Sequence, residues 1–222
     1  GIAGSLALNL ITDTTTAEVF GGSVVNAGTG DSTLSADEEM AATASAKPAG
    51  DTTGGKLGIG ASVALNLITS TATAEIDDGA TFSGGKDLAV KAQSGIATTT
   101  EAEAGAGGGV AIDAVVALAT LDETTTARIG TGTALDLTGA LGIEASNEGE
   151  NEATATGDTK SSDVGVGAAV AAIVGGGSAS GAFDNTSVTT AELARSVTAA
   201  ALTLSADADR SYSADATATA GG

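Results

Sequence analysis

The chain has 222 residues, a formal net charge of −20, and neither histidine nor cysteine. Without these residues it cannot build Ser-His-Asp triads, thiol nucleophiles, haem or iron–sulfur centres, or the usual zinc sites. The charge also makes nucleic acid and anionic membranes unsuitable partners, because phosphate groups would be repelled. There is one proline, where about eleven would be ordinary for this length. This favours long hydrogen-bonded strands over disorder, since proline removes a backbone donor.

Four similar segments follow one another along the chain: GIAGSLALNLITDTTTAEV (1–19), GIGASVALNLITSTATAEI (58–76), AIDAVVALATLDETTTARI (111–129) and GVGAAVAAIVGGGSASGAF (165–183). They predict a single repeat array over 1–222, with units at about 1–57, 58–110, 111–164 and 165–222. In the last unit, Gly175, Gly176 and Gly177 replace the usual Ile/Leu-Thr-Asp run. We therefore expect its first strand to be shorter or distorted.

The first half of each unit alternates with a period of two residues. In the second unit, Val63, Leu65 and Leu67 alternate with small or polar residues, which is typical of a strand. The apolar positions at matching places are expected to stack in the interior: Leu8, Leu65, Leu118, Ile11, Ile68 and Leu121. Both sets can point inward only if a bulge lies between Leu67 and Ile68.

The second half of each unit, at 32–46, 87–105, 140–157 and 201–222, aligns Leu34, Val90, Ile143 and Leu204. Its alternating alanines predict that part of the interior is thin. Each half could form a coil of about 27 residues, or each unit one wide coil. Either way, we predict an all-β fold, an elongated right-handed parallel β-solenoid (β-helix) of tandem repeats.

Threonine runs are the first candidate for a binding surface. Stacked strands would align them into ranks of hydroxyl and methyl groups, formed by Thr14, Thr16, Thr71, Thr73, Thr124 and Thr126. Such a flat array resembles an ice-binding face. The alternative is an ordinary solvent-exposed sheet face, where threonine is favoured. Glu18, Glu75 and Arg128 interrupt the same surface.

Acidic turns are the second candidate. Asp31, Asp77 and Asp78 lie in predicted turns, and calcium takes six to eight oxygen ligands. A repeated GGxGxD motif is absent. We therefore predict no metal site and no cofactor, with calcium at these turns as the alternative.

Carboxylate pairs are the third candidate: Glu101 and Glu103, Glu148 and Glu150, and Glu38 and Glu39. A glycosidase needs two carboxylates at a defined separation. No aromatic residue clusters with these pairs in the sequence, and sugar clefts use aromatic platforms. We predict no catalytic residues and no enzymatic activity.

Three phrases resemble a known class of protein: SVALNLITSTATAEI (62–76), DGATFSGGKDLAVKA (78–92) and TTTEAEAGAGGGVAI (98–112). They look like the repeats of very large bacterial surface proteins, namely filamentous-haemagglutinin-like exoproteins, autotransporter passengers and giant adhesins. The resemblance implies a parallel β-solenoid, export from the cell, and a role in adhesion or as a stalk.

The functional expectation follows from the repeats and this resemblance. We expect a structural or adhesive segment of an extracellular or cell-surface bacterial protein, serving as stalk, spacer or filament subunit. The alternative is a solenoid module that binds ice, calcium or a glycan. The chain opens with glycine inside a repeat, so we expect it to belong to a longer protein. Its partners would be neighbouring coils of that chain or identical copies end to end, which would form linear fibres. No membrane span is expected, because the longest apolar stretch, 164–177, is shorter than the about 20 residues a helix needs.

Overall fold

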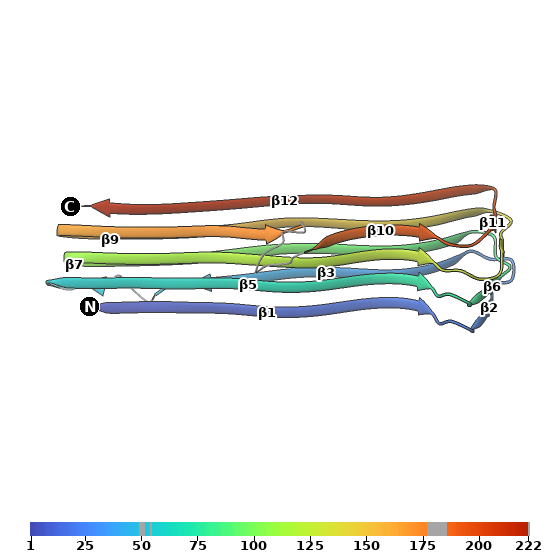
Figure 1. Ribbon diagram of the computed structural model, residues 1–222, viewed down its shortest axis with the longest axis horizontal. Coiled ribbons are helices and arrows are strands. Elements are labelled where there is room, and N and C mark those ends of the chain that lie inside the picture. Colours follow the sequence, from blue (N-terminus) through green and yellow to red (C-terminus); the bar gives the residue numbers. More distant parts are fainter. Residues whose placement is uncertain (49–51, 54, 177–185, 222) are drawn as a thin grey trace.

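The computed structural model describes residues 1–48, 52–53, 55–176 and 186–221. In this part of the chain every regular element is a strand, and every strand pairing is parallel. The main sheet doubles back on itself to form two layers (Figure 1). The prediction of an all-β fold with parallel strands is therefore confirmed.

Each repeat contributes one strand to each layer. The front layer holds β1 (Ile2–Val19), β5 (Leu57–Ile76), residues 110–129 of β7 (Leu88–Ile129), the second part of β9 (Ala140–Gly175), and β10 (Ser187–Leu193). The back layer holds β3 (Ser32–Ala46), β4 (Thr52–Thr53), residues 88–108 of β7, the first part of β9, and β12 (Ala201–Gly221). Of the two predicted arrangements, the structure has one wide circuit per repeat.

Short strands line the end where front strands turn into back strands, at the right of Figure 1. Here β2 (Val24–Asn26) pairs with β6 (Thr81–Ser83), and β8 (Leu135–Asp136) with β11 (Val197–Thr198). The buried Arg195 joins these turns. Its guanidinium donates to the carbonyls of Gly130 (2.5 Å), Ala80 (2.8 Å), Asp77 (3.0 Å) and Thr131 (3.1 Å).

The strands pair in the register of the sequence repeats. Ile2 pairs with Ile59, and Ile59 with Ile112. In the back layer, Leu34 pairs with Val90, and Val90 with Ile143. Equivalent residues therefore lie side by side on neighbouring strands, and the predicted alignment of the second halves is confirmed.

The interior changes character along the strands. Near the short strands it is wide and aliphatic, with Ile76, Val90, Ile129 and Ile143 fully buried. Further along, Ile68, Ile96 and Leu121 are buried, and beyond them the buried hydrophobic residues are alanines and Val115. The layers converge there, since a Cβ added to Gly60 would lie 2.9 Å from the carbonyl oxygen of Gly105. This agrees with the expected thin interior.

The expected interior position of Leu8, Leu65 and Leu118 is wrong. Residues 58–76 alternate without a bulge, so Leu65 and Ile68, three residues apart, point to opposite sides of the sheet. Ile68 and Leu121 are buried and Ile11 packs against them, as expected. The leucine row points outward, because the layers are closely spaced there and the inward positions beside it hold Ala64, Ala117 and Asn66, whose amide bonds the opposite layer.

Asparagines tie the two layers together at equivalent places in the first two repeats. The side-chain amide of Asn9 donates to the carbonyl of Thr43 (2.8 Å), and that of Asn66 to the carbonyl of Thr99 (3.0 Å). Asn9 also donates to the side-chain oxygen of Asn66 (2.9 Å). The Asn66 amide is fully buried, so these bonds give it the partners that it would otherwise lack in the interior.

The front strand of the last repeat is interrupted, as predicted. β9 ends at Gly175 opposite Leu121, and pairing resumes with Ser187 opposite Glu123. Tyr212 of β12 lies against Gly175, where an added Cβ would lie 3.0 Å from the tyrosine ring. Gly177, part of the same prediction, lies outside the described residues.

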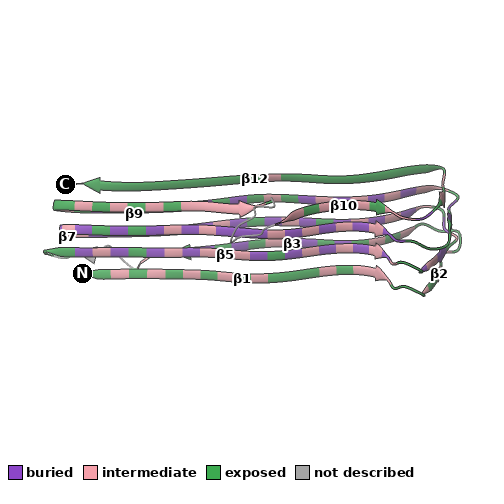
Figure 2. Cartoon of the chain, viewed as in Figure 1, coloured by how far each residue is buried: buried purple, intermediate pink, exposed green. Residues whose placement is uncertain are grey.

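Burial falls toward both edges of the stack (Figure 2). Almost every described side chain of β12 is exposed, including Leu202 and Leu204, which occupy inward positions in register with buried Leu141 and Ile143. The edge strand β1 is likewise more exposed than β5 beside it.

Candidate functional site on the outer faces

The outer side of the back layer is acidic. Outward positions on its strands carry many carboxylates and few cations: Asp37, Glu39, Glu101, Glu103, Glu144, Glu148, Glu150, Glu152, Asp158, Asp207, Asp209 and Asp215, with Lys47, Lys91 and Lys160 among them. Lys47 bridges Glu101 (3.1 Å) and Glu103 (3.3 Å). Much of the net charge of −20 therefore lies on one face.

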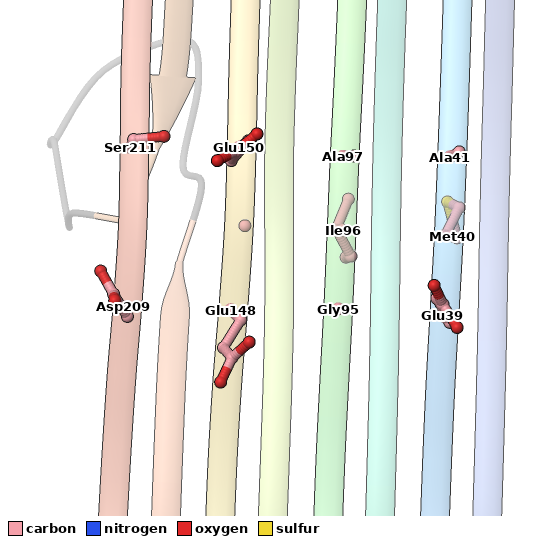
Figure 3. A pocket seen from close by; sticks show the side chains of 11 residues that line it. Glu39, Met40, Ala41, Gly95, Ile96, Ala97, Glu148, Glu150, Asp209 and Ser211 are labelled. Atoms are coloured by element: carbon pink, nitrogen blue, oxygen red, sulfur yellow. The ribbon is translucent and has the colours of Figure 1, made fainter.

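A shallow trough of about 710 Å³ crosses this acidic face (Figure 3). Its floor is low because Gly95 and Ala97 occupy outward positions on β7. In one row, Gly95 lies between Glu39 and Glu148. In the next row, Ala97 lies between Ala41 and Glu150.

The two carboxylates of a predicted pair do not always lie on the same side of their strand. Glu148 and Glu150 point outward together and line the trough. Glu38 and Glu39 point to opposite sides of β3. Glu39 is exposed, whereas Glu38 is buried and accepts a hydrogen bond from Ser70 Oγ (2.5 Å). Burial raises the pKa of the Glu38 carboxyl above its ordinary range.

The threonine ranks lie on the outer side of the front layer. Thr14, Thr71 and Thr124 are side by side in one row, and Thr16, Thr73 and Thr126 in the next. Thr190 of β10 extends the second rank. The structure thus brings together all six predicted threonines.

Charged residues bound these ranks. Glu18, Glu75 and Arg128 form the following row, and Arg128 forms ion pairs with Glu75, with Asp78 (2.9 Å) and with Glu192 (3.3 Å). Asp122 takes the outward position on the other side of the ranks, opposite Thr69. The flat hydroxyl surface is therefore two rows deep.

The other half of the same side is apolar, which the sequence analysis missed. We call it the apolar face: the outward side chains of residues 2–10, 59–67, 112–118 and 166–172. The strand alternation is evident in the sequence, but hydrophobicity favours its larger residues for the interior. The signal that could have revealed this face is the asparagine and serine between those residues, since Asn9, Asn66 and Ser62 tie the layers and strands together from inside.

The candidate calcium turns use their carboxylates to hold adjacent turns. Asp78 accepts bonds from the Thr131 amide (2.6 Å) and from Arg128 (2.9 Å), and the Thr131 amide contributes most to lowering the pKa of this carboxyl. Asp77 accepts from the Gly21 amide (3.1 Å). Asp31 pairs with Lys86 (3.5 Å), far from the other two in the chain.

Comparison with protein-family models, with curated proteins and with solved structures gave no match. In the part of the chain that the structure describes, no three acidic side chains are grouped so as to hold a metal ion. The described residues also include no helix with the length and apolarity to cross a membrane.

Proposed function

We propose that this chain is a structural segment of an extracellular repeat protein, in which it forms a wide parallel β-solenoid serving as stalk, spacer or filament subunit. The observation that carries the proposal is the register, which places Ile2, Ile59 and Ile112 side by side and continues in the same way along the strands. A stack of equivalent coils, each contacting only its neighbours, is the organisation of solenoid proteins.

The interior bonds support this reading. The asparagine tie is present in the first two coils, from Asn9 to Thr43 and from Asn66 to Thr99. A side chain that bonds the same backbone position in two neighbouring coils gives them the same width, while Ala119 and Ile173 take the equivalent places in the next two coils. The coil can then be repeated without a change of cross-section.

The exposed inner side of β12 supports stacking. Leu202 and Leu204 are each about half exposed, at positions where the preceding coils bury an aliphatic residue. A further coil, from the same chain or from another copy, would cover them and pair with the edge backbone.

The test is to lengthen the stack. Cysteine can be introduced at Thr16 and Thr190, because the chain has none of its own, and spin labels attached there report the distance across the coils. One, two or three extra copies of residues 58–110 are then inserted after residue 110. Each copy should lengthen the distance by about 4.8 Å. A shuffled insert of the same composition is the control, and an unchanged or broad distribution with the native inserts would contradict the proposal.

The register of the threonines favours a second candidate, a ligand-binding module. The ranks of Thr14, Thr71 and Thr124 and of Thr16, Thr73 and Thr126 form a regular array on an exposed face. If this array binds ice, the protein should inhibit ice recrystallisation, and Thr71→Tyr should abolish the effect. Equal activity of the variant, or none in the parent protein, would reject this candidate.

A further inference from the structure

The apolar face remains uncovered in the isolated chain. At its edge Ile2, Leu6 and Leu10 are 72–81% exposed. On β9, the strand at the opposite edge of the face, Val166 and Val170 are about half exposed, and Ile112 on the central strand β7 is 40% exposed. The face cannot be hidden by shifting the strands, because a slip of one residue would put Asn66 and Glu123 outside and the leucines into the thin interior.

We propose that the apolar face binds the same face of a second copy of this chain, so that two molecules pack front layer against front layer. With strands about 4.8 Å apart and outward rows about 6.7 Å apart, the face covers roughly 600 Å². That lies at the top of the range for patches on monomeric proteins. Pairing would bury about 1,200 Å² in total, the lower bound for stable interfaces.

The surface shape of the apolar face is self-complementary. A row of small residues, including Gly4, Ala61 and Ala114, lies between the row of Ile59 and the row of Val63. It forms a trough that runs across the strands. Both copies have the same row spacing, so a bulky row of one can enter the small row of the other. Such an isologous contact closes on itself as a dimer.

The distribution of charge favours this partner. No outward position in the four described segments of the apolar face carries a charge, whereas carboxylates crowd the back layer. Pairing through the front layers puts the two acidic faces on the outside. Three gaps lie between the four layers, and the two gaps inside the molecules are narrower than the usual 10 Å, so the acidic faces are about 20–30 Å apart. This is more than twice the screening length of about 8 Å at physiological ionic strength.

In the proposed dimer, the two molecules contact each other only through the apolar halves of their front layers. Asp122 and the row of Glu18, Glu75 and Arg128 lie in the threonine half of the same layer. A two-fold axis through the apolar half leaves both threonine halves projecting at opposite ends. The dimer therefore keeps the threonine ranks exposed to solvent.

The first experiment measures mass by sedimentation velocity from 5 to 200 µM in physiological salt. The parent chain should form dimers, and Leu65→Lys combined with Leu118→Lys should be monomeric with an unchanged circular dichroism spectrum. Thr73→Lys is the matched control, because it adds charge on the same side of β5 outside the apolar face, and it should remain dimeric. A monomeric parent chain, or a dimeric double variant, overturns the proposal.

A second experiment distinguishes this face-to-face contact from the end-to-end stacking of coils that is part of the proposed function. Leu65→Cys should give a cross-linked dimer with a short bismaleimide, whereas Ala97→Cys on the back layer should give none. Species cross-linked through Ala97 and not Leu65 would overturn the proposal. So would flotation of the monomer with phosphatidylcholine vesicles in place of dimerisation. Loss of coil growth in the insertion experiment with retained Leu65 cross-linking would instead reject only the solenoid function.

Discussion

Glu123 of the front layer and Arg210 of β12 in the back layer form an ion pair that crosses the interior of the fold. The Glu123 side chain is 1% exposed and the Arg210 side chain 8%. Glu123 belongs to the third repeat and Arg210 to the fourth, so the pair links the layers between successive repeats. Removing one partner of such a pair leaves an uncompensated buried charge.

The Glu123–Arg210 pair gives the first prediction. Arg210→Met should lower the free energy of unfolding by about 3–5 kcal/mol, because Glu123 keeps its charge without a partner. Combining it with Glu123→Leu should restore most of the loss. Urea denaturation of both variants measures this, and equal destabilisation by the single and double changes would contradict the assignment of a coupled pair.

Leu65 and Ile68 predict opposite responses to the same substitution. Ile68→Asp should cost about 4 kcal/mol, because it buries a charge in a closed interior. Leu65→Asp should cost about 1 kcal/mol, since its side chain points outward and keeps contact with water. Chemical denaturation at low protein concentration compares the two. A larger loss for Leu65→Asp would show that the strand has the opposite face inward.

Glu38 predicts a pH dependence of stability. Burial raises the pKa of this carboxyl in the folded state, with Asp13 adding to the rise and the Ser70 hydrogen bond opposing it. The folded state therefore holds the proton more tightly than the unfolded state, so stability from this group is full below the ordinary pKa and is lost as pH rises through the raised value. Each unit of the rise is worth about 1.4 kcal/mol.

Glu38→Gln should accordingly stabilise the protein at pH 7 and change little at pH 3. Glu39→Gln, one residue away and exposed, is the matched control and should have a small effect at both values. Denaturation midpoints measured from pH 3 to 8 provide the comparison. A Glu38→Gln effect that is the same across this range would show that the carboxyl is not buried.

Arg195 predicts a specific requirement for a guanidinium. Arg195→Lys keeps the charge but cannot reach four carbonyls at once, so it should cost about 2 kcal/mol. For a chain of this length that lowers the melting temperature by about 4–8 °C. Lys160→Ala, which removes the exposed pair with Asp158 (2.8 Å), should change it by less than about 2 °C. Equal melting temperatures for Arg195→Lys and the parent would refute the turn-joining role.

Calcium should have little effect on stability. Asp77 and Asp78 already accept hydrogen bonds from neighbouring turns, and Asp31 pairs with Lys86. A ligand that binds only the folded state stabilises it by mass action. Millimolar calcium should therefore shift the melting temperature by no more than a few degrees, comparable to the same ionic strength of sodium chloride. A calcium-specific rise above about 10 °C would favour the binding-module function instead.

The repeats alone determined the strand type, the parallel register and the alignment of Leu34 with Val90 and Ile143, because equal sequences pair best when in phase. They also placed Thr14, Thr71 and Thr124 in one rank. All of these depend only on the period of the sequence and on which positions are equivalent.

Only the tertiary structure decided which side of each strand faces inward. Alternation places Leu65 and Asn66 on opposite sides of the strand but does not say which side faces the interior. Hydrophobicity favours Leu65 for the interior. The distance between the layers reversed this choice: alanine-lined strands approach until Gly60 lies against Gly105, and the remaining space accepts Asn66, whose amide reaches the Thr99 carbonyl. That spacing arises between segments more than thirty residues apart, so no local pattern encodes it, and the apolar face is its consequence.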